Sequence, residues 1–182
     1  MKRISMAVLA AAGLCVAVVA PARAQGSLRY GVNAGVVMPM GDYNTADKPG
    51  FIGGAGATYW LAGLPIGIRV DGSYSQTSHD GGISGNTKIA GGMASVVYAL
   101  MPANAPARPF VTAGLGYYNV KADFGGTSAS ESKVGFGGGA GVAFKLGPSS
   151  TRLVVATRYT SVSTTGSSTT FLPITVGLTF GK

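Results

Sequence analysis

The feature that most constrains this chain is an alternation of side-chain character with a period of two, repeated about eight times. In residues 134–146 the even positions are mostly large and apolar, and the odd positions are glycine, alanine and finally Lys145. Residues 66–76 and 172–180 follow the same rule. Because successive side chains of a β-strand point to opposite faces, the pattern predicts all-β strands with one apolar and one small or polar face.

Weaker copies of the pattern bring the expected number of strands to eight. Most are close to the ~9–11 residues that a tilted strand needs to cross a bilayer. An even number of strands places both ends of the barrel sequence on the same side of the membrane, the periplasm. The side-chain facing stays open for residues 88–100 and 110–121. The expected strands are 30–38, 51–61, 66–76, 88–100, 110–121, 134–146, 153–159 and 172–180.

The connections between these strands alternate in length. Residues 62–65 and 147–151 are short Pro/Gly-marked turns, and residues 101–109 form a Pro-rich link. Short turns on one side and long loops on the other are typical of a transmembrane barrel. We therefore predict an eight-stranded antiparallel transmembrane up-and-down β-barrel. The expected long polar loops are residues 41–50, 77–87, 122–132 and 161–170.

The first 24 residues are typical of a cleaved secretory signal peptide. Two basic residues near the start precede an uncharged segment over residues 6–20, and residues 22–24 read Ala-Arg-Ala, the small-x-small pattern of a cleavage site. The apolar run is shorter than the ~20 residues of a spanning helix. We predict cleavage before Gln25, so that residues 25–182 form the barrel domain.

Composition excludes several classes of function. One Cys and one His exclude a disulfide scaffold, a Cys-rich zinc module and a multi-histidine metal site. Cleavage would leave 11 basic against 6 acidic side chains, scattered and without aromatic interleaving, so we expect no nucleic-acid partner. No motif indicates a cofactor. Only 11% of residues are charged, whereas soluble surfaces carry roughly a quarter or more, which favours a lipid environment.

Three segments resemble the outer-membrane-protein β-barrel domain family. They are RPFVTAGLGYY at residues 108–118, VVATRYT at residues 154–160 and FLPITVGLTF at residues 171–180. The resemblance extends over essentially the whole of residues 25–182. It implies a small porin-like barrel of about eight strands in the Gram-negative cell outer membrane.

The resemblance bears on fold and location more than on activity. We predict a non-catalytic protein with a structural, surface-interaction or envelope-integrity role, surrounded by outer membrane lipid. Barrels of this family end on an aromatic residue that the assembly machinery recognises, so the strand Leu172–Phe180 is the expected contact with that machinery. Here Gly181 and Lys182 follow Phe180, which departs from the family pattern. We expect a monomer.

Four charged residues fall on the small-residue faces: Arg69, Asp71, Lys145 and Arg158. They point into the barrel if the apolar faces meet lipid. Interior charges are costly unless paired or hydrated, and eight-stranded barrels are narrow enough for side chains to fill them. We predict a structural interior charge network that plugs the lumen. The alternative is a narrow path for ions or protons.

Four alternate glycines superficially resemble a phosphate-binding loop. They lack the strand-to-helix context and the Lys-Ser/Thr pair of such a loop. We interpret them as small residues that leave interior room for Tyr, Arg and Lys side chains from other strands. These glycines are Gly135, Gly137, Gly139 and Gly141.

Two loop clusters are weaker candidates for a site. Ser78, His79 and Glu131 could form a Ser–His–Glu lipid hydrolase at the outer rim, as in lipid A deacylating barrels, which are also small and eight-stranded. Catalysis needs fixed geometry, and the adjacent Gly81-Gly82 makes this loop pliable, so we favour a solvated loop histidine that is dispensable. Asp42, Asn44 and Asp47 could offer oxygen ligands to a cation, but a solvated hairpin tip is the preferred interpretation.

A second alternative is a soluble periplasmic barrel that holds a lipophilic ligand, as lipocalins do. That fold would place Ile66, Ile68, Val70 and Tyr74 inside. The membrane barrel places the same residues outside, against lipid. The two hypotheses therefore differ in which face of each strand points inward.

Overall fold

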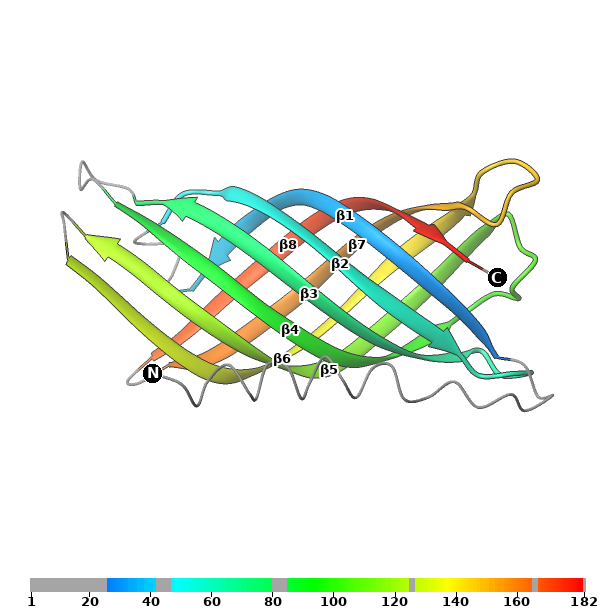
Figure 1. The fold of residues 1–182 in the computed structure, drawn as a ribbon, viewed down its shortest axis with the longest axis horizontal. Helices are drawn as coiled ribbons and strands as arrows, with labels where there is room; N and C mark the ends of the chain where they lie inside the picture. Colours follow the sequence, from blue (N-terminus) through cyan, green and yellow to red (C-terminus); the bar gives the residue numbers. More distant parts are fainter. Residues whose placement is uncertain (1–25, 42–46, 80–84, 125–126, 165–166, 182) are drawn as a thin grey trace, which may run out of the picture.

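The computed structural model describes residues 26–41, 47–79, 85–124, 127–164 and 167–181, and the predicted signal peptide lies outside these ranges. Each strand pairs antiparallel with its neighbours in the chain, and β8 pairs with β1 to close the barrel (Figure 1). The predicted all-β fold is confirmed. The strands are β1 Ser27–Met40, β2 Gly50–Trp60, β3 Ile66–Ser78, β4 Gly85–Ala99, β5 Ala107–Phe124, β6 Thr127–Lys145, β7 Arg152–Thr164 and β8 Ser167–Phe180.

The register of the strands sets the width of the barrel. Following paired residues once around the sheet from Tyr30 leads back to β1 at Met40, ten residues further along the chain. With ~3.3 Å per residue and ~4.8 Å between strands, this offset tilts the strands by about 40°. An eight-stranded barrel of this tilt has an interior that side chains can fill.

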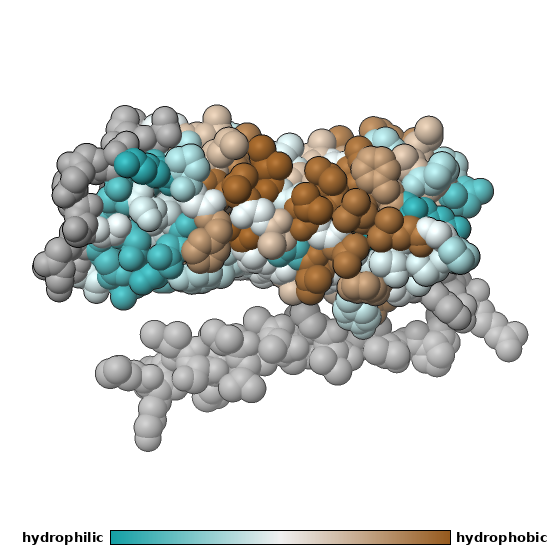
Figure 2. Space-filling view, turned by 90° about the horizontal axis from the view of Figure 1, so that it is seen from above, coloured by the Kyte–Doolittle hydropathy of each residue, from teal (hydrophilic) through white to brown (hydrophobic). Residues whose placement is uncertain are grey.

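The outer surface carries an apolar band. Val134 and Phe136 of β6 are 61% and 53% exposed, as expected for side chains that contact lipid rather than protein. On β2 the band runs from Phe51 to Tyr59, which corresponds to about 20 Å along the barrel axis at this tilt. Figure 2 shows hydrophobic side chains over the middle of the barrel and hydrophilic ones at both ends. This is the arrangement of a membrane-spanning barrel.

The structure settles the facing of β4 and β5. On β4 the inward side chains include Ile89, Met93 and Val97, whereas on β5 they include Phe110 and Tyr118. Large apolar residues therefore point inward on these two strands as well as outward. Periodicity alone could not assign their faces for this reason.

The alternate glycines of β6 face the lumen and make room for large side chains. A Cβ at Gly141 would lie 2.6 Å from Cζ of Phe110, and one at Gly137 would lie 3.1 Å from Cε of Met93. The room we expected on this face is present. The side chains of Tyr118, Phe110 and Met93 lie closest to these glycines, which confirms the expected tyrosine and adds a phenylalanine and a methionine.

Two of the expected long loops are wrong. Residues 122–132 and 161–170 belong largely to strands, because β5 reaches Phe124, β6 starts at Thr127, β7 reaches Thr164 and β8 starts at Ser167. These segments extend beyond the apolar band, where both faces are polar, so the alternation that marks the other strands is missing. Cross-strand hydrogen bonds connect them instead. The side-chain nitrogen Nδ2 of Asn119, for example, donates to the hydroxyls of Ser130 and Ser132, each at 2.9 Å.

The barrel has a short-turn end and an extended-hairpin end. The connections at residues 61–65, 100–106 and 146–151 lie close to the apolar band, whereas the hairpins at the other end extend well beyond it. Because outer membrane barrels protrude little on the periplasmic side and much further on the outside, the first of these ends is assigned to the periplasm. The first residues of β1 and the last of β8 lie at the same end (Figure 1). Among the described residues, no helix is long and apolar enough to cross a membrane.

Candidate functional site

An ion pair crosses the middle of the lumen. Both guanidinium end nitrogens of Arg158 on β7 donate to the carboxylate of Asp71 on β3, at 2.8 and 2.9 Å. β3 and β7 are four strands apart in a ring of eight, so the pair connects opposite walls of the barrel. Paired, two-pronged contacts of this kind are the strongest between arginine and a carboxylate.

Arg69 lies on the same inner face of β3 as Asp71. Its Nε donates to the Thr58 hydroxyl at 3.0 Å, and its guanidinium carbon lies 5.2 Å from the centre of the Phe110 ring. A cavity of about 120 Å³ adjoins these groups. Since a water molecule takes up about 30 Å³ in the liquid, this space suits a few waters. The middle of the lumen is thus polar enough to be hydrated.

Lys145 is at a different place from the other three charged residues. It is the last residue of β6, exposed at the periplasmic mouth, and it faces Arg152 across the β6–β7 pair. The structure therefore brings Arg69, Asp71 and Arg158 together and leaves Lys145 at the rim.

An apolar cluster lies in the outer half of the lumen. Its inward side chains are buried, and the rings of Tyr118 and Phe171 meet edge to face with centroids 6.2 Å apart. Sequence reasoning missed this cluster, although adjacent apolar pairs such as Val36-Val37 and Phe51-Ile52 indicate apolar side chains on both faces. The cluster consists of Val37, Ile52, Ile89, Tyr118, Val162 and Phe171.

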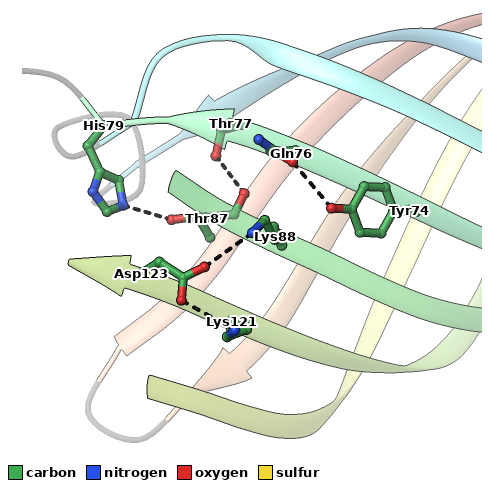
Figure 3. A network of polar contacts seen from close by, with 8 residues as sticks. All are labelled: Tyr74, Gln76, Thr77, His79, Thr87, Lys88, Lys121 and Asp123. Atoms are coloured by element: carbon green, nitrogen blue, oxygen red, sulfur yellow. Dashed lines mark hydrogen bonds and ion pairs between the residues drawn. The ribbon is translucent and has the colours of Figure 1, made fainter. Parts of the chain in front are cut away.

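A buried carboxylate lies at the outer end of the lumen. Asp47 is only 4% exposed, and it accepts hydrogen bonds from the hydroxyls of Thr77 and Thr87 at 2.8 and 3.1 Å. The Nε2 atom of His79 lies 3.2 Å from the Thr87 hydroxyl (Figure 3) and 3.8 Å from the Asp47 carboxylate. Hydrogen bonding of Asp47 by two hydroxyls is what makes its burial tolerable.

The expectation that Asp47 and His79 belong to solvated loops is wrong. The two residues form a β-bridge, and the Lys48 amide donates to the Ser78 carbonyl at 2.8 Å. These contacts hold the segment before β2 against the end of β3, and both side chains are 3% exposed. The other suggested cation ligands, Asp42 and Asn44, lie outside the described residues.

The proposed Ser–His–Glu set is not assembled. Ser78 points outward and is exposed, whereas His79 points inward, because adjacent residues of a strand face opposite ways. Glu131 is on β6, beyond β4 and β5, and pairs with Lys133 at 2.9 Å. Within the described ranges no group of three or more His, Cys, Asp or Glu side chains could hold a metal ion.

The outer surface above the apolar band carries a small charge cluster. Lys88 and Lys121 contact the two carboxylate oxygens of Asp123, at 3.3 and 3.4 Å (Figure 3). Desolvation acts to raise the pKa of Asp123, but hydrogen bonds and charge attraction from the two lysines outweigh it and lower that pKa below its usual value. This cluster is solvated and lies beyond the membrane-spanning part of β5.

A closed eight-stranded barrel with an apolar outer band and a filled lumen defines the class of small integral β-barrel membrane proteins. The chain belongs to the outer membrane protein β-barrel domain family, whose model matches residues 6–180. It is therefore an outer membrane protein. The lipocalin-like alternative is wrong, because Ile68 and Val70 point outward and are 52% and 46% exposed.

Solved structures share the fold. Neisserial surface protein A is 19% identical, with a TM-score of 0.69, over 87% of this chain and 100% of its own. A major outer membrane protein from Thermus thermophilus is 14% identical, with a TM-score of 0.62, over 86% and 99%. The outer membrane enzyme PagL is 15% identical, with a TM-score of 0.50, over 84% and 98%. No curated protein matches the chain by sequence.

Proposed function

We propose that this protein is a non-catalytic outer membrane barrel with a structural, surface-interaction or envelope-integrity role, and that its lumen does not conduct. The observation that carries this proposal is the ion pair between Asp71 and Arg158, which connects opposite walls of the barrel. The apolar cluster above it supports the proposal as a second obstacle to ions. In this proposal the two obstacles together interrupt the polar path through the lumen.

The interior charges are then structural. In this proposal Asp71 and Arg158 neutralise each other, and Arg69 is satisfied by Thr58 and the Phe110 ring. Lys145 contributes charge at the periplasmic rim rather than to the plug. Polar hairpins outside the apolar band, above all the ends of β5 and β6, supply the surface for interaction.

Planar-bilayer recording tests whether the lumen is blocked. The wild-type protein should show no conductance steps, because an ion would have to displace both the ion pair and the apolar cluster. A variant that combines Asp71→Ala, Arg158→Ala and Phe171→Ala should open small steps if it folds, with heat-modifiable gel migration as the folding check. Regular steps from the wild-type protein would overturn the proposal in favour of the ion-path alternative.

The lipid hydrolase alternative is tested by a separate activity assay, because PagL is an enzyme with this fold. We expect purified protein to release no fatty acid from lipid A or phospholipid, since Ser78 and His79 face opposite ways. His79→Ala should therefore leave barrel assembly intact. Deacylation by the wild-type protein that disappears in both Ser78→Ala and His79→Ala would reverse the proposal.

Three further proposals concern maturation. Mass spectrometry of membrane-extracted protein should find the N-terminus at Gln25, and intact residues 1–24 would contradict cleavage.

We propose that β8 contacts the barrel assembly machinery, so Phe180→Ala should slow assembly into membranes that contain this machinery but not spontaneous insertion into pure lipid. Light scattering with detergent correction should give the mass of a monomer.

A further inference from the structure

The periplasmic mouth of the barrel is ringed by arginines. Arg29 on β1, Arg108 on β5 and Arg152 on β7 face inward at this end, close enough for their charges to repel one another. In the part of the chain that the structure describes, no carboxylate lies at this mouth. The described carboxylates belong to Asp47, Asp71, Asp123 and Glu131, which lie in the middle of the barrel or at its outer end.

The three arginines differ in how fully the protein engages them. Arg152 donates three hydrogen bonds, to the carbonyls of Ala103, Ala105 and Ala143, and so holds the β4–β5 link in place. Arg29 donates one to the Ser150 carbonyl and Arg108 one to that of Met101. Since a guanidinium has five N–H groups, Arg29 and Arg108 retain donors beyond these contacts with the described residues.

A cavity of about 580 Å³, open to the outside, lies against these two arginines. Its size is typical of small-molecule sites. The guanidinium carbon of Arg108 lies 4.0 Å from the centre of the Trp60 ring, which fixes the orientation of the charge at the cavity wall. The lining also includes exposed apolar side chains, those of Leu64, Leu100 and Met101.

We propose that this cavity binds the phosphate group of an anionic phospholipid from the inner leaflet of the outer membrane. Arg29 and Arg108 supply charged donors that suit a phosphate, and the anion relieves the repulsion among the arginines. The apolar side chains of the lining take the start of an acyl chain. The cavity is at the right depth, because its lining residue Tyr98 belongs to the periplasmic edge of the apolar band. The site does not depend on whether the barrel is catalytic.

Trp60 provides a direct readout, because it is the single tryptophan of the chain and lines the cavity. Folded protein in an uncharged detergent would be titrated with dihexanoyl phosphatidylglycerol, with dihexanoyl phosphatidylcholine and with inorganic phosphate. We expect a saturable change in fluorescence, with half-saturation by phosphatidylglycerol at least tenfold below that by phosphatidylcholine or phosphate. Equal half-saturation by all three, or no saturable change, would overturn the proposal. Inorganic phosphate that binds as tightly as phosphatidylglycerol would assign the site to free phosphate and overturn the lipid occupant.

Substitution of Arg29 tests whether the Trp60 fluorescence change depends on this arginine. Arg29→Gln should raise the half-saturation concentration at least tenfold, and this residue does not stack on Trp60, so the reporter is retained. The matched control is Lys145→Gln, which removes a positive charge from the same end but outside the cavity lining and should leave binding unchanged.

A second measurement does not depend on fluorescence. Native mass spectrometry should show phosphatidylglycerol retained by the wild-type and Lys145→Gln proteins and lost from Arg29→Gln and Arg108→Gln. Each sample would first be checked for heat-modifiable migration, which shows that the barrel is folded. Retention of the lipid by folded Arg29→Gln and Arg108→Gln proteins would overturn the site.

Discussion

An apolar cluster packs in the outer half of the lumen, whereas the middle holds an ion pair beside a cavity large enough for a few waters. The apolar half resembles the core of a soluble protein, where stability depends on packing without voids. In the middle, stability depends on the pairing of Asp71 with Arg158, because each buried charge is tolerable only while the other is present. The barrel interior is therefore filled in two ways, by apolar packing and by an ion pair. Mutations in the two regions should lower the free energy of unfolding by different amounts and for different reasons.

The largest effect should come from the apolar half. Phe171→Ala removes a ring that is 3% exposed and leaves a cavity against Tyr118, so we expect a loss of about 4 kcal/mol in the free energy of unfolding. Urea unfolding in phospholipid vesicles measures it. The matched control is Phe136→Ala on the lipid face, which leaves no internal cavity and should cost less. Equal costs at both positions would remove the distinction between a packed interior and a lipid-covered surface.

Breaking the ion pair should have the next largest effect. Arg158→Ala leaves the Asp71 carboxylate without its main partner, which we expect to cost about 3 kcal/mol, the low end for a buried pair because water reaches this site. Adding Asp71→Ala should recover part of the loss. The same unfolding assay with Lys145→Ala, at the exposed rim, should show a change of less than about 0.5 kcal/mol. Additive losses in the double variant would contradict a direct coupling.

A smaller effect is expected where a carboxylate is buried above the apolar cluster. Thr77→Val keeps the shape of the side chain but removes a hydroxyl that donates to Asp47, so stability should fall by about 1.5 kcal/mol. Thr112→Val is the control, because the Thr112 hydroxyl donates to an uncharged backbone carbonyl, that of Val96. If both variants lost the same amount, the charge of Asp47 would not matter at this position.

The smallest effect concerns pH at the outer surface. Because the pKa of Asp123 is lowered in the folded protein, its contribution to stability is present above the pKa of the unfolded chain and is lost as pH falls through the folded value. Wild-type stability should therefore decline slightly more than that of Asp123→Asn between pH 7 and pH 3. High salt should abolish the difference, since the pair is solvated. Identical pH profiles at low salt would show that the lysine contacts have no energetic role.

The strands that cross the membrane were predictable because lipid and lumen impose different demands on their two faces. The alternation over residues 66–76, 134–146 and 172–180 located β3, β6 and β8 and assigned their faces. The prediction from alternation failed where both faces of a strand carry side chains of the same kind. Apolar side chains face both ways in the outer half, as at Val36 and Val37, and polar side chains face both ways in the hairpin ends beyond the membrane.

The site was predictable only in part. Sequence placed Asp71 and Arg158 on inward faces, but their pairing depends on the register around the whole barrel, which local patterns do not contain. The burial of Asp47 was missed for a related reason, since its hydroxyl donors Thr77 and Thr87 lie 30 and 40 residues away along the chain. The arginine mouth was missed because its three members come from three separate strands.

The contact between β3 and β7 also bears on the order of steps in barrel assembly. Asp71 and Arg158 are 87 residues apart and lie on facing walls, so Arg158 can reach the carboxylate only when the last hairpin joins the sheet. Until that step, water must solvate both charges within the half-formed barrel. The final strands therefore close the sheet and pair these two charges in the same step, which should make completion of the barrel an abrupt and cooperative event.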